Sequence, residues 1–151
     1  MEKQLQKYLR DYQDALAQGR LALKQKSGTK ALAAFSKAKT LYKRIARSKE
    51  MTQLSRTLDQ NLANGHYLVG ATQYVTKPCK GAHHFWSAYQ LVPDDRKVKT
   101  RIEQMRLKAD QIYREASAEA KVNPSTAQQK AKAALCLVPK TSELYQKLKS
   151  L

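Results

Sequence analysis

Apolar residues recur along this chain three or four positions apart, which places them on one side of a helix. In residues 2–26 this stripe consists of Leu5, Tyr8, Leu9, Tyr12, Ala15, Leu16, Gly19 and Leu23. The same spacing predicts six further helices, at about 29–48, 52–75, 79–91, 95–121, 126–137 and 141–151. Proline or glycine lies at most of the boundaries, and no segment alternates in the way of a strand. The pattern therefore predicts an all-α fold.

Local signals predict how several of these helices begin and end. Ser27-Gly28 breaks the first helix, and Thr29 is the expected N-cap of the second. Pro93-Asp94-Asp95 ends the fourth helix and offers a carboxylate cap to the fifth. Thr141 is the expected N-cap of the short last helix, which can cover the end of the fold.

Three segments share a pattern of small and aromatic residues. The pattern is Ala31-x3-Phe35-x2-Ala38, then Gly81-x3-Phe85-x2-Ala88, then Ala127-x3-Ala131-x2-Ala134. The last alanines of the three segments lie 50 and then 46 residues apart. Each segment predicts a helix that packs closely, through its small residues, against another helix. The repetition predicts one domain, 1–151, made of three hairpins at about 2–48, 52–91 and 95–137 and a cap at 141–151.

The order of long helix, turn, short helix and closing proline resembles the tetratricopeptide repeat. The matching residues are Gly19, Ala31, Phe35 and Ala38 in the first unit, Gly70, Gly81, Phe85, Ala88 and Pro93 in the second, and Ala127, Ala134 and Pro139 in the third. The resemblance implies a right-handed array of helical hairpins, an α-solenoid, that acts as a protein-binding scaffold. The spacing of 46 to 50 residues exceeds the family's period of about 34 and is closer to HEAT-like helix pairs, so the repeat type is left open.

The resemblance also implies a binding surface, because the first helices of such hairpins line a concave groove. The predicted groove residues are Arg56, Gln60, Asn64 and Tyr67, with Tyr74, on the third helix, and Lys99, Arg106 and Tyr113, with Asp110, on the fifth. Basic, amide and aromatic groups together suit an acidic or carboxylate-bearing protein segment. The alternative interpretation is a hydrated helix face.

Charge adds a second candidate surface. The chain has 29 Lys and Arg against 12 Asp and Glu, a net charge of +17, and no acidic residue occurs between Asp14 and Glu50. The predicted basic patch in this region comprises Arg20, Lys24, Lys30, Lys37, Arg44 and Arg47. Such a patch attracts nucleic acid, acidic peptides or anionic lipid. The alternative is a solvated face that keeps the domain soluble or balances an acidic part of a longer chain.

Candidate chemical residues are few. Cys79, His83, His84 and His66 invite a metal interpretation, but structural zinc normally takes four ligands at recognisable spacings that this chain lacks. Cys79 lies at a predicted helix start among lysines, where a thiol pKa would fall; an ordinary surface thiol is the preferred interpretation. Cys136 is expected in the core. No triad-like set or cofactor fingerprint is present, so we predict no enzymatic activity and no cofactor.

The longest apolar runs, Ala31 to Phe35 and Ala133 to Val138, are far shorter than the roughly 18 residues of a membrane span. No signal peptide is visible at Met1, and the two cysteines, which we expect to be unpaired, suit a reducing compartment. We therefore predict a cytoplasmic protein without a transmembrane segment. Its predicted function is that of a non-catalytic protein–protein interaction scaffold, and the alternative is a basic module that binds nucleic acid or an anionic membrane surface.

Overall fold

The computed structural model describes residues 2–45 and 51–151 and consists of helices. They are α1 (Glu2–Lys24), α2 (Gly28–Ile45), α3 (Met51–Gln73), α4 (Pro78–Leu91), α5 (Arg96–Glu119), α6 (Pro124–Ala134), the 3₁₀ turn η1 (Leu135–Leu137) and α7 (Glu143–Lys149). No strand occurs in the described residues. The all-α prediction is confirmed, with helix boundaries within a few residues of those expected.

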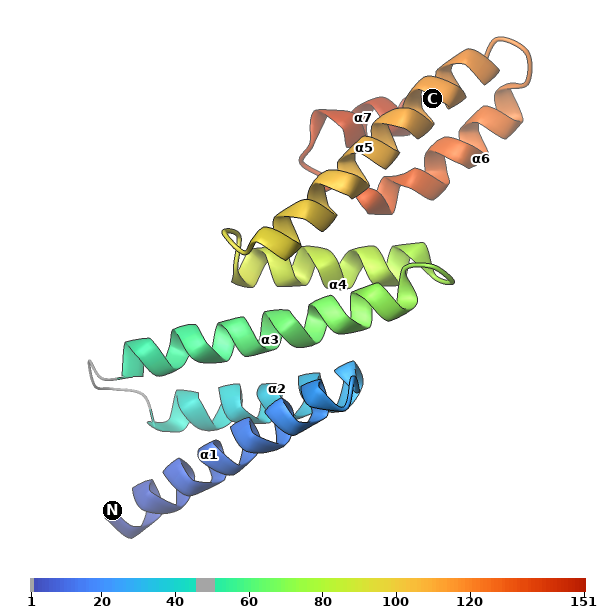
Figure 1. Cartoon of the computed structure of the whole chain (residues 1–151). Helices are drawn as coiled ribbons and strands as arrows, with labels where there is room; N and C mark the ends of the chain where they lie inside the picture. The colour runs from blue at the N-terminus through green and yellow to red at the C-terminus, as the bar shows by residue number, and fades with distance from the viewer. Residues whose placement is uncertain (1, 46–50) are drawn as a thin grey trace.

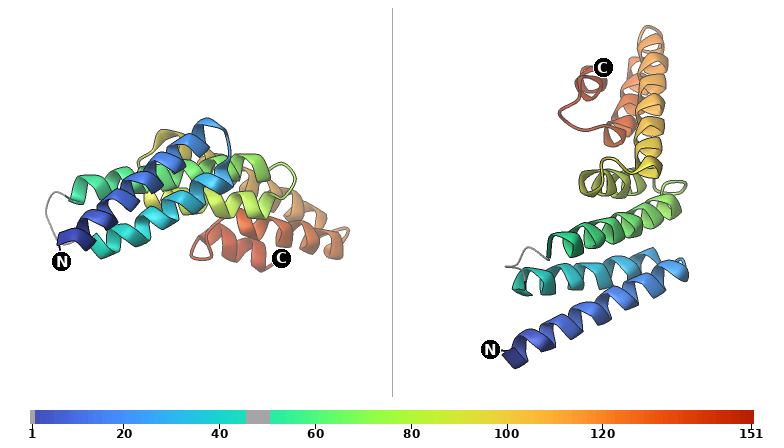
Figure 2. Two further views of the ribbon diagram at one scale, coloured as in Figure 1. Left: turned by 90° about the horizontal axis from the view of Figure 1, so that it is seen from below. Right: turned by 60° about the vertical axis from the view of Figure 1, so that its left-hand side comes forward.

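Neighbouring helices pack in sequence order along an elongated molecule (Figure 1). α1 packs on α2, α3 on α4 and α5 on α6, while α2–α3 and α4–α5 contacts join one pair to the next. α7 lies against α5 and α6, and η1 contacts α4 and α5. The N-terminus lies at one end of this stack and the C-terminus near the other (Figure 2). The paired arrangement is consistent with a helical repeat.

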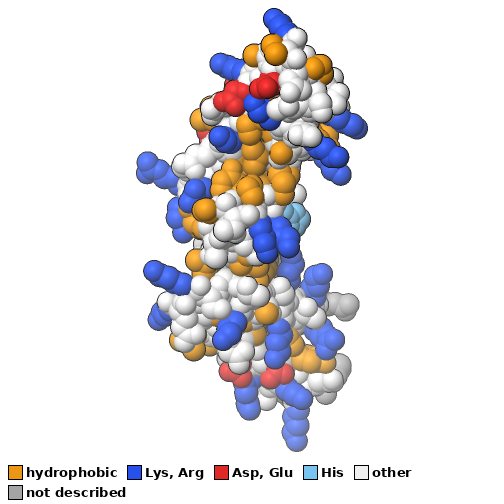
Figure 3. All heavy atoms as spheres, turned by 90° about the vertical axis from the view of Figure 1, so that its right-hand side faces the viewer, with side chains coloured by type: hydrophobic (Ala, Val, Ile, Leu, Met, Phe, Trp, Pro, Cys, Tyr) orange, Lys and Arg blue, Asp and Glu red, His pale blue; other side chains and the backbone are white. Residues whose placement is uncertain are grey.

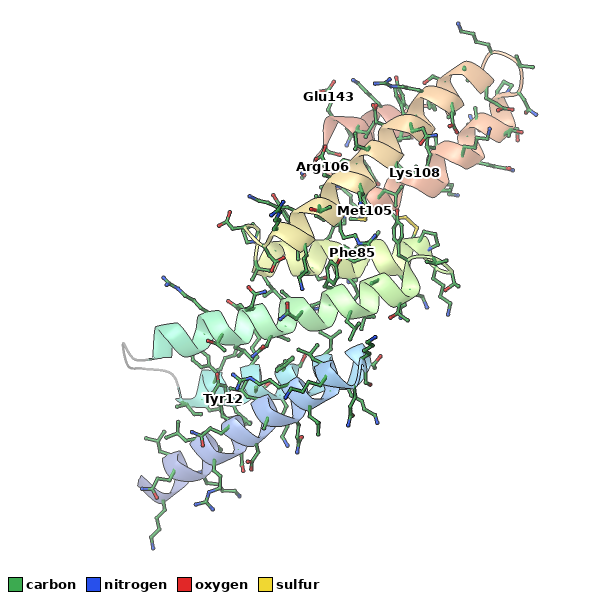
Figure 4. All side chains as sticks on the ribbon, viewed as in Figure 1. Tyr12, Phe85, Met105, Arg106, Lys108 and Glu143 are labelled. Carbon is green, nitrogen blue, oxygen red and sulfur yellow. A yellow bond between two sulfur atoms is a disulfide. The ribbon has the colours of Figure 1, made fainter. Side chains whose placement is uncertain are left out.

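The buried apolar residues form two clusters. The N-terminal cluster comprises Tyr12, Ala15, Leu16, Ala22, Ala31, Phe35, Ala38, Leu41, Leu58 and Leu62. The C-terminal cluster comprises Ala63, Ala82, Phe85, Ala88, Val98, Ile102, Met105, Ala109, Ala116, Ala127, Ala131, Ala134, Leu137, Val138 and Leu148. Figure 4 shows Tyr12 at the α1–α2 interface and Phe85 on α4. The division falls within α3, because this helix gives its early apolar residues to one cluster and later ones to the other.

The repeated sequence pattern has a packing explanation. A Cβ atom added at Gly19 would collide with the Phe35 ring, and one added at Gly70 would lie 2.9 Å from the Phe85 ring. In each of the first two hairpins, therefore, a glycine on the first helix makes room for the phenylalanine of the second. The corresponding positions of the third hairpin, Ala116 and Ala131, are both buried alanines.

The turn between α1 and α2 differs from the one expected at Ser27-Gly28. Lys26 has a φ of 55°, so this residue carries the left-handed conformation, and Gly28 already belongs to α2. A Cβ at Gly28 would lie 2.6 Å from Val69 Cγ2, so this glycine allows close approach of α3. The carbonyl of Ser27 accepts the first helical bond, from Ala31 N at 3.0 Å. Ser27 thus holds the N-cap position, and the expectation of Thr29 is wrong by two residues.

Side-chain caps set the first residues of α5, α6 and α7. Asp95 caps α5 as predicted, since its Oδ1 accepts from Val98 N at 3.1 Å. Asn123 caps α6 by accepting from Thr126 N at 3.2 Å. Ser142 caps α7 by accepting from Tyr145 N at 3.2 Å, so the expected cap Thr141 is off by one residue.

The two cysteines are paired, contrary to the prediction. Cys79 at the start of α4 and Cys136 in η1 form a disulfide, with Cα atoms 5.4 Å apart across 57 residues of sequence. Neither residue is therefore a free thiol, and half-buried Cys136 is a disulfide partner at the edge of the core. Disulfides persist in oxidising compartments, so the cysteines no longer support a cytoplasmic location. None of the helices in the described part of the chain is long and apolar enough to span a membrane.

Candidate functional site

A hollow of about 400 Å³ lies between α3 and the beginning of α5. Its lining is basic and polar: Tyr67 comes from α3, and Arg96, Lys97, Thr100, Arg101 and Gln104 come from α5. Residues three or four positions apart share one side of a helix, and the five α5 residues follow this spacing in two adjacent rows. We call this feature the α3–α5 hollow.

Tyr67 organises the cations of the α3–α5 hollow. Its ring packs against the core residue Phe85 with centroids 5.6 Å apart, which fixes the ring in place. Lys97 Nζ lies 5.2 Å and Arg101 Cζ 6.0 Å from the centre of the Tyr67 ring, within the range of cation–π attraction. Arg101 Nε also donates to the Tyr67 hydroxyl at 3.4 Å. The aromatic ring therefore holds two positive charges at the mouth of the hollow.

An amide–carboxylate cluster beside the hollow fixes α5 against α3. Gln60 Nε2 donates to Asn64 Oδ1 at 3.2 Å and to Asp95 Oδ2 at 3.0 Å. Burial would raise the pKa of Asp95, but hydrogen bonds from Val98 N–H and Gln60, with the charge of Lys97, hold that pKa below its ordinary value. Both Asp95 oxygens already accept hydrogen bonds within the protein. We therefore assign a positioning role, holding α5 against α3, to Gln60, Asn64 and Asp95.

The predicted groove residues do not all meet on one surface. Gln60, Asn64 and Tyr67 lie together at the α3–α5 junction, and Arg56 is exposed near the start of α3. On α5, Lys99 pairs with Asp94 at 3.8 Å, and Arg106 lies over the Trp86 ring with its Cζ 5.6 Å from the ring centre. Tyr113 is half-buried against the C-terminal cluster.

These three α5 residues lie on the side of the helix away from the hollow. At about 100° per residue, Lys99, Arg106 and Tyr113 are roughly opposite Lys97. Figure 4 likewise shows Arg106 and Lys108 on opposite sides of α5. The sequence shows both polar flanks of the buried stripe on α5. Which flank faces Tyr67 depends on the angle between helices, and this is why Lys97, Arg101 and Gln104 were missed.

The predicted basic patch is spread over the first hairpin. Arg20 and Lys24 are exposed on α1, and Lys30, Lys37 and Arg44 are exposed on α2. Arg44 Cζ lies 5.8 Å from the centre of the Tyr8 ring on α1. Arg47 lies outside the described residues. Over the face drawn in Figure 3, Lys and Arg side chains extend along most of the molecule, with few acidic side chains between them.

The histidines form a pair across α3 and α4. The Nδ1 atoms of His66 and His84 lie 2.9 Å apart, so one ring donates and the other accepts. Burial, then the neighbouring His84 and His83, lowers the pKa of His66 to about 4, and burial with His83 lowers that of His84. Cys79 is held in the disulfide, and no group of three or more His, Cys, Asp or Glu suited to a metal ion occurs among the described residues.

Trp86 packs between the second and third hairpins. Its Nε1 donates to the carbonyl of Leu137 in η1 at 3.2 Å, and its ring meets Tyr89 edge-on with centroids 5.7 Å apart. Together with the disulfide, this contact fixes η1 against α4.

No protein-family model, curated protein or solved structure matches the chain. The α3–α5 hollow and the basic surface of the first hairpin are therefore the features whose chemistry bears on function.

Proposed function

We propose that this protein is a non-catalytic scaffold that binds an acidic or carboxylate-bearing segment of another protein in the α3–α5 hollow. The observation that carries the proposal is the arrangement of Lys97 and Arg101 around the Tyr67 ring. An arginine fork pairs with a carboxylate through two parallel hydrogen bonds, and a nearby lysine adds charge without requiring a fixed direction.

The position of Arg101 favours binding at low entropic cost. Its Nε donates to Tyr67, and its Nη1 donates to Gln104 Oε1 at 3.3 Å. Its Cζ also lies 5.5 Å from the centre of the Phe85 ring. A side chain already held by three neighbours loses little rotamer freedom when a ligand arrives. Tyr67 adds an aromatic surface beside the charge, which suits an apolar side chain next to the carboxylate.

The repeat interpretation belongs to the same proposal. Two first helices of hairpins, α3 and α5, contribute to the hollow, as in the concave groove of a tetratricopeptide-like solenoid. The Gly19–Phe35 and Gly70–Phe85 contacts support a common unit in the first two hairpins. We propose that the third hairpin is a variant of that unit, in a right-handed array capped by α7.

The α3–α5 hollow can be tested with a labelled peptide rich in Asp and Glu, in forms with a free or an amidated C-terminus. We expect Arg101→Gln to weaken binding of this peptide by about tenfold or more. Lys99→Gln is the matched control, because it removes one positive charge from the opposite side of the same helix. Fluorescence anisotropy gives the affinities, and circular dichroism checks that each variant is folded. Equal losses in Arg101→Gln and Lys99→Gln would contradict a localised site.

The second candidate function, binding of nucleic acid or an anionic membrane surface, is supported by the net charge of +17 and the exposed basic patch. A salt series separates it from peptide capture. Polyanion binding weakens linearly in log affinity against log salt concentration, whereas a Tyr67-anchored peptide retains an affinity that depends less on salt. If a heparin column retains the protein and Arg101→Gln does not alter that retention, the polyanion surface is separate from the hollow.

A further inference from the structure

A second hollow, of about 440 Å³, lies between α1 and α2. Leu21 and Ala22 of α1 and Ala33 and Ala34 of α2 contribute apolar atoms to it, and Lys30 and Lys37 line it from α2. Leu21 is 56% exposed, so the hollow has a large apolar side chain at its surface. We call this feature the end hollow.

The end hollow lies on the outer side of the helical stack. On its inner side α2 meets α3 through Gly28, which faces Val69, and Leu32, which faces Gly65. Ala33, Lys30 and Lys37 lie on the other side of α2, because residues turn by about 100° along a helix. At the opposite end of the molecule α7 packs on α5 and α6 and leaves Leu148 only 2% exposed. In the described structure, α1 and α2 have no such cover at the end hollow (Figure 1).

The charge around the end hollow has one sign. Lys30 and Lys37 are exposed, and neither has an ion-pair partner among the described residues. No acidic residue occurs in the sequence between Asp14 and Glu50, so α2 contributes no carboxylate to this surface. An occupant with carboxylates beside an apolar stripe therefore complements both the apolar lining and the lysines.

We propose that the end hollow binds an acidic amphipathic helix of another protein, with its apolar stripe on Leu21 and Ala33 and its carboxylates on Lys30 and Lys37. Alanines in the lining allow a helix backbone to approach closely, as Gly28 and Gly65 do on the inner side of α2. A second copy of this chain is a poor occupant, because each copy carries a net charge of +17. A nucleic acid would use the lysines and leave the apolar lining without a role.

The proposal concerns a different surface from the α3–α5 hollow and does not depend on it. The probe is a labelled helical peptide of about 18 residues, about 27 Å long, with a leucine stripe flanked by glutamates. A scrambled peptide of the same composition is the control for charge alone. Binding is measured to the full chain by fluorescence anisotropy, with circular dichroism as the check on folding.

Two pairs of matched variants test the two halves of the recognition. Leu21→Ser should lower the affinity for the peptide by about tenfold. Its control is Leu107→Ser, at a residue of α5 that is 62% exposed, which should leave the affinity within about twofold. The double variant Lys30→Glu with Lys37→Glu should lower the affinity for the peptide by about a hundredfold. The double variant Lys39→Glu with Lys43→Glu makes the same charge change at exposed positions of α2 outside the end hollow. It should lower the affinity for the peptide far less.

Four results would overturn the proposal. If Leu21→Ser has no effect while Lys30→Glu with Lys37→Glu abolishes binding, the surface binds polyanions through charge alone. If the scrambled peptide binds equally well, the occupant need not be an amphipathic helix. If only Arg101→Gln removes binding, the peptide occupies the α3–α5 hollow. Light scattering that shows dimers dissociated by Leu21→Ser would instead assign the end hollow to a second copy.

Discussion

The two ends of the helical stack differ in what closes them. At the C-terminal end α7 packs on α5 and α6, and the Cys79–Cys136 disulfide joins η1 to α4. At the N-terminal end the α1–α2 hairpin leaves Leu21 exposed beside the end hollow. The four ion pairs of the described residues all lie between Asp94 and Lys147, and most of their side chains are well exposed, so they add little stability.

The two clusters also differ in the contacts that enclose them. The C-terminal cluster is closed by the chain itself, through a disulfide, a short helix and the Trp86–Leu137 hydrogen bond. The N-terminal cluster depends mainly on apolar packing and faces a hollow lined by lysines. A partner helix bound at the end hollow would cover the outer side of the first hairpin, as α7 covers the third hairpin.

The largest expected effects come from the two buried phenylalanines. We expect Phe35→Ala and Phe85→Ala each to reduce the free energy of unfolding by about 3–5 kcal/mol, because both side chains are at most 1% exposed and fill space left by a glycine. Hydrogen exchange should show the Phe35→Ala effect mainly in α1 and α2. Equal acceleration in α5–α7 would show that the two clusters unfold as one unit.

The sequence predicted the buried stripes well because burial follows local periodicity. Phe35 and Phe85 of the repeated pattern are both in the core, and Asp95 caps α5 as expected because a cap acts within one helical turn. The helix break was expected at Ser27-Gly28, but the left-handed residue is Lys26, and Gly28 instead allows the close approach of Val69.

Features that join distant parts of the chain could not be read from local pattern. Cys79 and Cys136 are 57 residues apart, and only the packing of η1 on α4 brings them together. The candidate site has the same limit. Tyr67 was identified on α3, but its partners Lys97 and Arg101 could not be, because they depend on how α5 is rotated about its axis.

The next largest effect is expected from removal of the disulfide, the covalent link that the C-terminal end has and the N-terminal end lacks. Cys79→Ser with Cys136→Ser should lower the free energy of unfolding by about 2–4 kcal/mol, because the unfolded chain regains the entropy of a long loop. Thermal melts with and without reductant measure it, and reductant should have no effect on the double variant. Exchange should accelerate in α6 and α7 and remain unchanged in α1. An unchanged melting temperature on reduction would contradict this role.

A smaller, pH-dependent effect is expected where α3 meets α4. The folded state lowers the pKa of His66 from 6.5 to about 4, so the unfolded state binds more protons between these values. This contribution to stability is complete above pH 6.5 and is lost as pH falls towards 4. Denaturant titrations at several pH values should show this slope, and His66→Gln should reduce it. His83→Gln, at the exposed neighbour, should retain most of it.

The smallest effect concerns one polar side-chain atom in each half of the molecule. The Tyr12 hydroxyl in the N-terminal cluster has no hydrogen-bond partner among the described residues, although Tyr12 is only 2% exposed. The Trp86 indole in the C-terminal region donates to Leu137 O. An unpartnered buried group costs free energy, whereas a satisfied one contributes to stability. We therefore expect Tyr12→Phe to raise the free energy of unfolding by up to about 1 kcal/mol.

The matching change, Trp86→Phe, should lower the free energy of unfolding by about 1–2 kcal/mol, because it removes the bond to Leu137 and some of the packing on Tyr89. Urea titrations of both variants give the two values. Opposite signs would show that the C-terminal region gains from polar contacts that the N-terminal region lacks. If Tyr12→Phe is destabilising by as much as Trp86→Phe, the Tyr12 hydroxyl is satisfied in solution, and the contrast between the ends reduces to the disulfide and α7.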